Sequence, residues 1–250
     1  MAVTEPKDMV SAAMRRLRTI NPVRPAELLR RDGLAYALWQ PDRAPLRGGV
    51  LILHGAGSCK ESHYDFCRAL LPLGFASISF DQRGHGESDG PMDGRAMSDV
   101  DSMAELLAER TGKPLALRGS SMGGYLALVA ASQVGAGAVV AICPASADQL
   151  RRSLRSGAHR FNADPQRLDA LLGQNDDLHA IVERIEIPVL LLHAEGDEVV
   201  PVEHSRELAG HLRHPESRLV VVPGGHHRSV QHDEELQALS TRFIERALSP

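Results

Sequence analysis

Residues 115–131 read LALRGSSMGGYLALVAA. A short apolar run is followed by the pattern G-x-S-x-G from Gly119 to Gly123, and an apolar run of helical character comes next. A serine in a sharp turn between a strand and a helix projects its hydroxyl above the sheet. The flanking positions must be glycine because a larger side chain would collide with the neighbouring strand or helix. The stretch therefore predicts a strand, a strained turn that carries a reactive serine, and a helix.

Ser121 occupies the serine position of this pattern. Ser120 is the alternative, but it would place the glycines at the wrong offsets. Free N–H groups at the start of the following helix would favour negative charge that develops near Ser121. Taken alone, the five-residue pattern is also compatible with a glycine-rich turn that serves packing only.

Short apolar runs alternate along the chain with longer stretches of helical period, which predicts a mostly parallel sheet covered by helices on both faces. Several runs are nearly continuous in Val, Ile, Leu and Ala, as is typical of strands buried on both faces. The expected strands are 34–39, 49–53, 76–80, 115–117, 138–142, 188–193 and 218–222, and the expected helices are 62–73, 95–110, 122–133, 203–213 and 233–248.

Residues 145–187 break this alternation, because they lie between two expected strands, carry many charges and suggest two or three short helices. We interpret them as a helical cap inserted over the carboxyl edge of the sheet. The length of 250 residues fits one domain over residues 1–250 that includes this cap. Near the N-terminus, Met9, Ala13, Leu17 and Ile20 have helical spacing and predict a short amphipathic helix packed on the domain.

The composition is that of an ordinary globular enzyme, with 43% hydrophobic and 24% charged residues. A net charge of −4 provides no general attraction for phosphate backbones, so no nucleic-acid partner is expected. The spacing of the three cysteines matches neither a disulfide framework nor a zinc motif. No stretch approaches the roughly 18 apolar residues of a membrane span, and the N-terminus lacks a secretory signal. We therefore expect a cytoplasmic protein with no membrane partner, and the oligomeric state stays open.

Four further motifs accompany the turn at Ser121. His54-Gly55-Ala56-Gly57 directly follows the strand expected at 49–53. The sequence DQRGHGES occupies residues 81–88 after the strand expected at 76–80. The strands expected at 188–193 and 218–222 lead into AEGDEVVP at residues 194–201 and PGGHH at residues 223–227.

Together these motifs resemble the α/β-hydrolase superfamily from about residue 28 to the C-terminus. The resemblance implies that the fold is an α/β-hydrolase fold, with its cap inserted after the sixth strand. It also implies that the backbone N–H groups of Ala56 and Met122 bind the oxyanion of a tetrahedral intermediate. In the motif at 81–88, Asp81 and Arg83 would serve structure by satisfying buried loop groups with charge-assisted hydrogen bonds.

The same resemblance implies a catalytic triad of Ser121 as nucleophile, His226 as general base and Asp197 as the acid that orients the histidine. This order along the chain is typical of the fold. His227 is an adjacent alternative to His226. Asp148, after the strand expected at 138–142, is a reserve for the acid, in which case Asp197 would only cap the next helix.

Nucleotide and metal sites are poorly supported by the motifs. A phosphate loop ending at Lys60 fails because Cys59 and Glu61 replace the required glycine and hydroxyl residue, and a dinucleotide fingerprint lacks its third glycine. The histidines and the carboxylate at 226, 227, 232 and 233 match no helical ligand spacing. No cofactor and no metal are expected.

Three arginines lie at positions where a charged side chain needs a partner or could bind one. Arg118 precedes the turn at a buried strand end, where a guanidinium must be paired. In the cap, Arg151 and Arg155 lie one helical turn apart and could bind an anionic substrate or form a solvated helix face.

The sequence as a whole predicts a serine hydrolase that cleaves a small carboxylic ester, or a related acyl substrate, through an acyl-enzyme intermediate. Peptidase, thioesterase, carbon–carbon hydrolase and perhydrolase chemistry use the same three residues and stay open. A binding protein that keeps the fold without turnover is the alternative outside enzymes, but the triad is intact.

Overall fold

The computed structural model describes residues 24–42 and 45–249. The amphipathic helix expected around Met9 to Ile20 lies outside these residues. The strands are β1 (Glu27–Arg31), β2 (Leu34–Trp39), β3 (Gly48–Leu53), β4 (Phe75–Phe80), β5 (Leu115–Ser120), β6 (Ala138–Ile142), β7 (Val189–Ala194) and β8 (Arg218–Val222). They form one eight-stranded sheet in the order β1-β2-β4-β3-β5-β6-β7-β8.

The sheet is parallel from β4 to β8, and β2 joins it antiparallel to β4 with β1 antiparallel at its edge. Strands β2 to β7 are buried along their whole length, which explains their nearly continuous apolar sequences. The expected α/β-hydrolase fold is confirmed. The sequence prediction missed β1, because ELLRR lacks an alternating pattern and most of its side chains are exposed.

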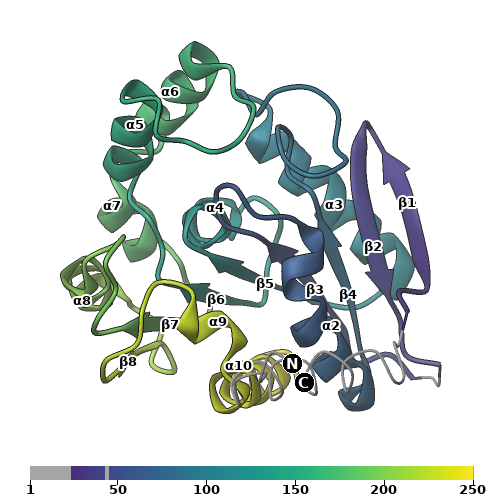
Figure 1. Ribbon diagram of the computed structural model, residues 1–250. Helices are drawn as coiled ribbons and strands as arrows, with labels where there is room; N and C mark the ends of the chain where they lie inside the picture. The colour runs from purple at the N-terminus through teal and green to yellow at the C-terminus, as the bar shows by residue number, and fades with distance from the viewer. Residues whose placement is uncertain (1–23, 43–44, 250) are drawn as a thin grey trace, which may run out of the picture.

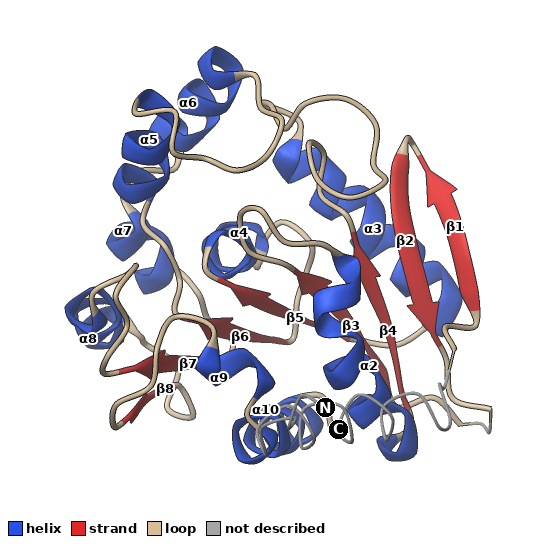
Figure 2. Ribbon diagram, in the orientation of Figure 1, coloured by secondary structure: helices blue, strands red, loops and turns tan. Residues whose placement is uncertain are grey.

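The helices and 3₁₀ turns are η1 (Lys60–His63), α2 (Tyr64–Leu70), η2 (Leu71–Leu73), α3 (Ala96–Thr111), α4 (Met122–Ala130), α5 (Ala147–Arg155), α6 (Pro165–Gln174), α7 (Leu178–Glu183), α8 (Val202–His211), α9 (Ser229–His232) and α10 (Glu234–Ala247). One apolar core joins the sheet to α3, α4 and α8, and a second core on the other face joins it to α2 and α10. Figure 2 shows these two helical layers around the sheet. None of the described helices is long and apolar enough to cross a membrane.

The segment expected to form a cap follows β6 and folds as α5, α6 and α7. Helices α5 and α6 pack against each other beyond the end of α4, as Figure 1 shows, whereas α7 packs against α4 and α8. The helix starts are well specified by sequence: Ser146 and Gln149 form a reciprocal capping box on α5, and Asp164 caps α6. Side chains of α5 and α6 line a cavity together with Ala56 and Met122, which follow β3 and β5, so the α5–α6 pair lies over the carboxyl ends of these strands.

Candidate active site

Ser121 lies at the sharp turn between β5 and α4, with φ 53° and ψ −117°. Its backbone N–H donates to the carbonyl oxygen of Ile142 on β6 at 2.8 Å. A Cβ at Gly119 would lie 2.0 Å from the carbonyl oxygen of Gly123, and one at Gly123 would lie 2.1 Å from that of Leu53. Only glycine fits at either position, so the G-x-S-x-G pattern is a steric requirement of the turn.

A pocket of about 190 Å³ opens beside Ser121. The loop after β3 forms one of its walls, since a Cβ at Gly55 would lie 3.3 Å from the Cβ of Ser121. The lining is mostly polar and consists of Gly55, Ala56, Ser58, Ser62, Ser120, Ser121, His227, Arg228, Gln231 and His232. The nucleophile proposed from sequence therefore shares a pocket with one imidazole of the PGGHH motif.

Asp197 lies at the turn after β7, and its side chain is fully buried. One carboxylate oxygen accepts the backbone N–H groups of Val199 and Val200 at 2.8 Å each, and the other accepts His227 Nδ1–H at 2.7 Å. Burial raises the pKa of this carboxyl, but the hydrogen bonds from the histidines and the backbone outweigh it and hold the pKa far below the ordinary value. The ionised carboxylate fixes the His227 tautomer and leaves Nε2 unprotonated.

His226, the histidine expected to pair with Asp197, does not do so. Its side chain is exposed, and its backbone N–H donates to Ser229 Oγ at 3.0 Å. Gly224 and Gly225 both have left-handed backbone conformations, with φ 66° and 76°, and they turn the chain before the two histidines. The first imidazole consequently points to solvent and the second reaches the buried carboxylate.

His193 is a second histidine at Asp197, which the sequence reasoning missed. It is fully buried at the end of β7, and its Nε2 lies 2.9 Å from the carbonyl oxygen of Val200 and 3.3 Å from Asp197 Oδ2. Its Nδ1 lies 2.7 Å from Ser205 Oγ. His193 thus helps to fix the carboxylate. An imidazole at the end of an otherwise apolar strand was the available signal.

The loop at residues 54–57 is held in place by two buried histidines. His54 is fully buried. Its Nδ1 lies 2.8 Å from the carbonyl oxygen of Gly55, and its Nε2 accepts a hydrogen bond from the backbone N–H of Gln82 at 3.1 Å. His85 Nε2 accepts the N–H of Gly57 at 3.0 Å. Ala56 is thereby held in the wall of the Ser121 pocket, where its N–H could serve an oxyanion. Met122 is the first residue of α4, so its N–H has no partner within the helix.

Burial, together with the neighbouring His85, lowers the pKa of His54 to about 4. As the pH falls, the imidazole of His54 binds a proton near pH 6.5 in the unfolded chain but only near pH 4 in the folded protein. His54 should therefore lower the free energy of unfolding by about 1.4 kcal/mol for each pH unit as the pH falls from 6.5 to 4. Urea unfolding at several pH values, compared with His54→Gln, measures the effect. His63 and His85 act in the same direction, so the difference in slope isolates His54. Equal slopes in both proteins would refute the assignment.

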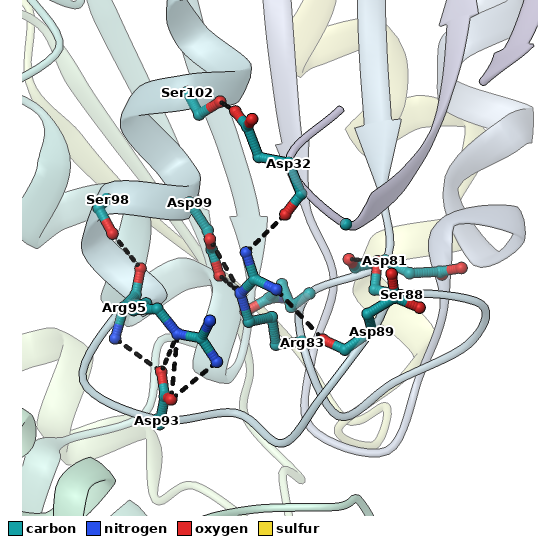
Figure 3. Close-up of polar contacts among 12 residues, drawn as sticks. Asp32, Asp81, Arg83, Ser88, Asp89, Asp93, Arg95, Ser98, Asp99 and Ser102 are labelled. Atoms are coloured by element: carbon teal, nitrogen blue, oxygen red, sulfur yellow. Dashed lines mark hydrogen bonds and ion pairs between the residues drawn. The ribbon is translucent and has the colours of Figure 1, made fainter. Parts of the chain in front are cut away.

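The turn at residues 81–88 has the structural role predicted for it. Asp81 is fully buried and accepts hydrogen bonds from the backbone N–H and the ammonium of Lys60 and from the N–H of Glu87. Figure 3 shows Arg83 bound to the Asp99 carboxylate and to the carbonyl oxygens of Asp32 and Asp89. These contacts fasten the turn beside the loop that carries Ala56.

Arg118 is buried near the carboxyl end of β5. The groups that contact its guanidinium are uncharged: an aromatic ring, a carbonyl oxygen and an imidazole. Its guanidinium lies 3.9 Å from the Phe66 ring centroid, donates to the Gln231 carbonyl oxygen at 3.0 Å and lies 3.2 Å from His63 Nδ1. Burial lowers its pKa to about 10. Because Gln231 belongs to α9, Arg118 ties the strand of the nucleophile to the segment that follows His227.

The cap arginines do not face either of the pockets next to Ser121. Arg151 donates to both carboxylate oxygens of Asp169 on α6, at 3.0 and 3.1 Å, and Arg155 donates to the same group at 3.3 Å. The opposite face of α5 turns inward with Leu150, Ser153 and Leu154. The predicted substrate contact of Arg151 and Arg155 is therefore not found. Both guanidiniums instead join the two cap helices at the surface.

An apolar cavity lies between α4 and the α5–α6 pair. Its lining is Ala56, Met92, Met122, Tyr125, Leu126, Leu150, Ser153, Leu154, His159, Phe161, Leu168, Leu171 and Leu172. Ala56 also lines the Ser121 pocket, so the cavity and the pocket meet at the loop expected to bind an oxyanion. The space open to a water-sized sphere is about 20 Å³, so an acyl chain needs the surrounding side chains to move.

A family model described as serine aminopeptidase, S33 matches residues 44–164 and 159–235. The uncharacterized protein YfhR of Escherichia coli (strain K12) is 27% identical over 210 residues, covering 80% of this chain and 71% of YfhR. The lysophosphatidylserine lipase ABHD12 of Danio rerio is 32% identical over 177 residues, covering 64% of this chain but only 46% of its own length.

Among solved structures, the monoacylglycerol lipase of Paleococcus ferrophilus superposes with a TM-score of 0.70 at 23% identity. The alignment covers 86% of this chain and 99% of the lipase. At this identity the likeness concerns the fold, with its central sheet and flanking helices. The family match extends over most of the chain and includes the turn at Ser121, the Asp197 turn and His227. The chain therefore belongs to the serine aminopeptidase S33 family and is an α/β-hydrolase.

Proposed function

We propose that this protein hydrolyses carboxylic esters that carry an apolar acyl group, through an acyl-enzyme on Ser121. His227 is the general base and Asp197 orients it, while the N–H groups of Ala56 and Met122 stabilise the oxyanion. The observation that carries the proposal is the hydrogen bond between buried Asp197 and His227 beside the pocket of Ser121.

In the proposed reaction, Ser121 Oγ attacks the ester carbonyl while its proton passes to His227 Nε2. The tetrahedral oxyanion forms at the N–H groups of Ala56 and Met122, and collapse expels the alcohol, which takes the proton from His227. Water then enters, gives its proton to His227 and attacks the acyl carbon. Collapse of this second tetrahedral intermediate breaks the bond to Ser121 Oγ, which takes the proton back from His227, and the carboxylic acid is released.

The cavity and the pocket support a division of the substrate. We assign the acyl group to the apolar cavity under α5 and α6, whose side chains must move apart to admit it, and the alcohol to the pocket with Ser58, Ser62 and Gln231. The two similar lipases, which act on a lysophospholipid and a monoacylglycerol by name, agree with this division. A small-molecule acyl ester is thus the proposed substrate.

Aminopeptidase activity, suggested by the family description, is the second candidate. An aminopeptidase must bind the ammonium group of a peptide N-terminus, which calls for a carboxylate near the nucleophile. Within the described part of the chain, neither the cavity nor the Ser121 pocket is lined by Asp or Glu, and the pocket contains Arg228. This charge distribution favours ester over aminopeptidase substrates.

The test is hydrolysis of p-nitrophenyl esters of increasing acyl length beside amino-acid p-nitroanilides with a free amine. We expect turnover of the esters, with kcat/KM rising as CH₂ groups are added by up to about fourfold each, since burying one contributes about 0.8 kcal/mol. Ser121→Ala should remove the activity, which controls for contaminating hydrolases. Faster turnover of the anilides than of every ester would contradict the proposed substrate class.

The cysteines support the expected location in the cytoplasm. Cys59, Cys67 and Cys143 are all free thiols in the structure, as is usual in a reducing compartment. The cytoplasm is therefore the proposed location.

A further inference from the structure

The thiol of Cys143 lies near the Asp197–His227 pair, and all three side chains are of kinds that can bind a metal ion. Cys143 is the first residue after β6, is 1% exposed, and its N–H donates to the Leu192 carbonyl oxygen on β7 at 2.8 Å. One ligand atom from each of Cys143, Asp197 and His227 can be chosen so that all three lie within 4.8 Å of one another. A sulfur, a nitrogen and an oxygen atom thus lie close enough together to bind one metal ion.

We propose that Cys143, Asp197 and His227 form a Zn²⁺ site, and that zinc bound there inhibits the enzyme. Zn²⁺ accepts this mixture of thiolate, imidazole and carboxylate, with bonds of about 2.0–2.3 Å and tetrahedral geometry. Three protein ligands leave the fourth position to water. Magnesium and calcium prefer oxygen ligands and are excluded by the thiol and the imidazole.

The charges and protons balance in the bound state. Cys143 loses its thiol proton to solvent, whereas the ring proton of His227 moves from Nδ1 to Nε2, so that the imidazole stays neutral and Nδ1 can bind the ion. Asp197 binds as the carboxylate that it already is. Thiolate and carboxylate together neutralise the two positive charges of the ion, which lowers the cost of holding it in a buried site. Burial and Asp197 raise the pKa of the Cys143 thiol, so the ion must displace that proton as zinc does from cysteine ligands generally.

Zinc at this point would hold His227 in the wrong tautomer. An imidazole that coordinates zinc through Nδ1 and stays neutral carries its proton on Nε2. That nitrogen then has no lone pair for the Ser121 hydroxyl proton. The ion would enter from the Ser121 pocket, because the His227 side chain is 13% exposed while the Asp197 side chain is 0% exposed. The inhibition rests on the proposed function, but the binding does not.

The direct test measures zinc binding to the full chain by competition with a chromophoric chelator, in wild type, Cys143→Ser and Cys67→Ser. Cys67 is the matched control, because it is equally buried but lies on α2. We expect one site that is lost in Cys143→Ser and kept in Cys67→Ser. When Cd²⁺ replaces Zn²⁺, wild type and Cys67→Ser should show the ultraviolet charge-transfer band of a metal–thiolate bond, and Cys143→Ser should not. Surface histidines would bind zinc equally in all three proteins, so unchanged binding in Cys143→Ser would overturn the proposal.

The second arm measures ester hydrolysis under the same conditions. Zinc at about 100 times its dissociation constant should leave roughly 1% of wild-type activity, a chelator should restore it, and Cys143→Ser should stay active. Zinc inhibition that is equal in wild type and Cys143→Ser would contradict the proposed mode of inhibition. If no ester is hydrolysed by any variant, the proposed function fails while the binding arm still decides the metal site.

Discussion

Replacing His227 by alanine is expected to lower kcat for ester hydrolysis by on the order of 10⁴- to 10⁶-fold, whereas His226→Ala should change it by no more than about twofold. His227 Nδ1 is held 2.7 Å from Asp197, so its Nε2 can accept the serine proton. His226 is exposed, and its Nδ1 accepts only the backbone N–H of Arg228, at 3.3 Å.

The comparison is sharp because the two histidines are neighbours in sequence and differ only in the direction of their side chains. Steady-state kinetics on the best p-nitrophenyl ester measures both variants, and circular dichroism controls for folding. A large loss in His226→Ala with a small one in His227→Ala would mean that the turn at Gly224 and Gly225 differs in the working enzyme.

Asp197→Asn is expected to lower kcat by on the order of 10⁴-fold. An asparagine amide can donate to Nδ1 and so stabilise the tautomer with the proton on Nε2, where it cannot accept the serine proton. The carboxylate charge that stabilises the imidazolium is lost as well. Because Asp197 also receives two backbone N–H groups, the variant should unfold at a lower urea concentration.

Asp148→Asn is the control for this prediction, since Asp148 was the reserve acid suggested by sequence. In the structure it is exposed in the first turn of α5. Its replacement should leave kcat within about twofold of wild type. The reverse outcome, with Asp148 essential and Asp197 dispensable, would move the acid to the cap and reduce the Asp197 turn to a structural role.

The sequence predicted the fold and most of the site because both depend on local patterns. Short apolar runs located β2, β6 and β8 to the residue, and the glycines at 119 and 123 identified the turn at Ser121. The Gly196-Asp197 turn was likewise recognisable from its own sequence, although its glycine is required by the close approach of the Gly225 carbonyl oxygen. These features are recognisable because the local chain must have that sequence to adopt that shape.

Other features depend on contacts between distant segments, which no local pattern reveals. Which histidine faces Asp197 is decided by two left-handed glycines and by the distance between the β7 and β8 loops. Arg151 lies on a helix face whose partner, Asp169, belongs to another helix. In the sequence His193 is only a residue near the end of an apolar strand, and its contact with Asp197 is visible only in the folded structure.

Ser121 is the proposed nucleophile, and His227 is proposed to activate it. Reaction with a fluorophosphonate followed by mass spectrometry tests this proposal directly, because only an activated hydroxyl attacks this reagent at useful rates. We predict one adduct on Ser121 in wild type and in Ser120→Ala, and strongly slowed labelling in His227→Ala. An adduct on Ser120, or undiminished labelling of Ser121 in His227→Ala, would contradict the account.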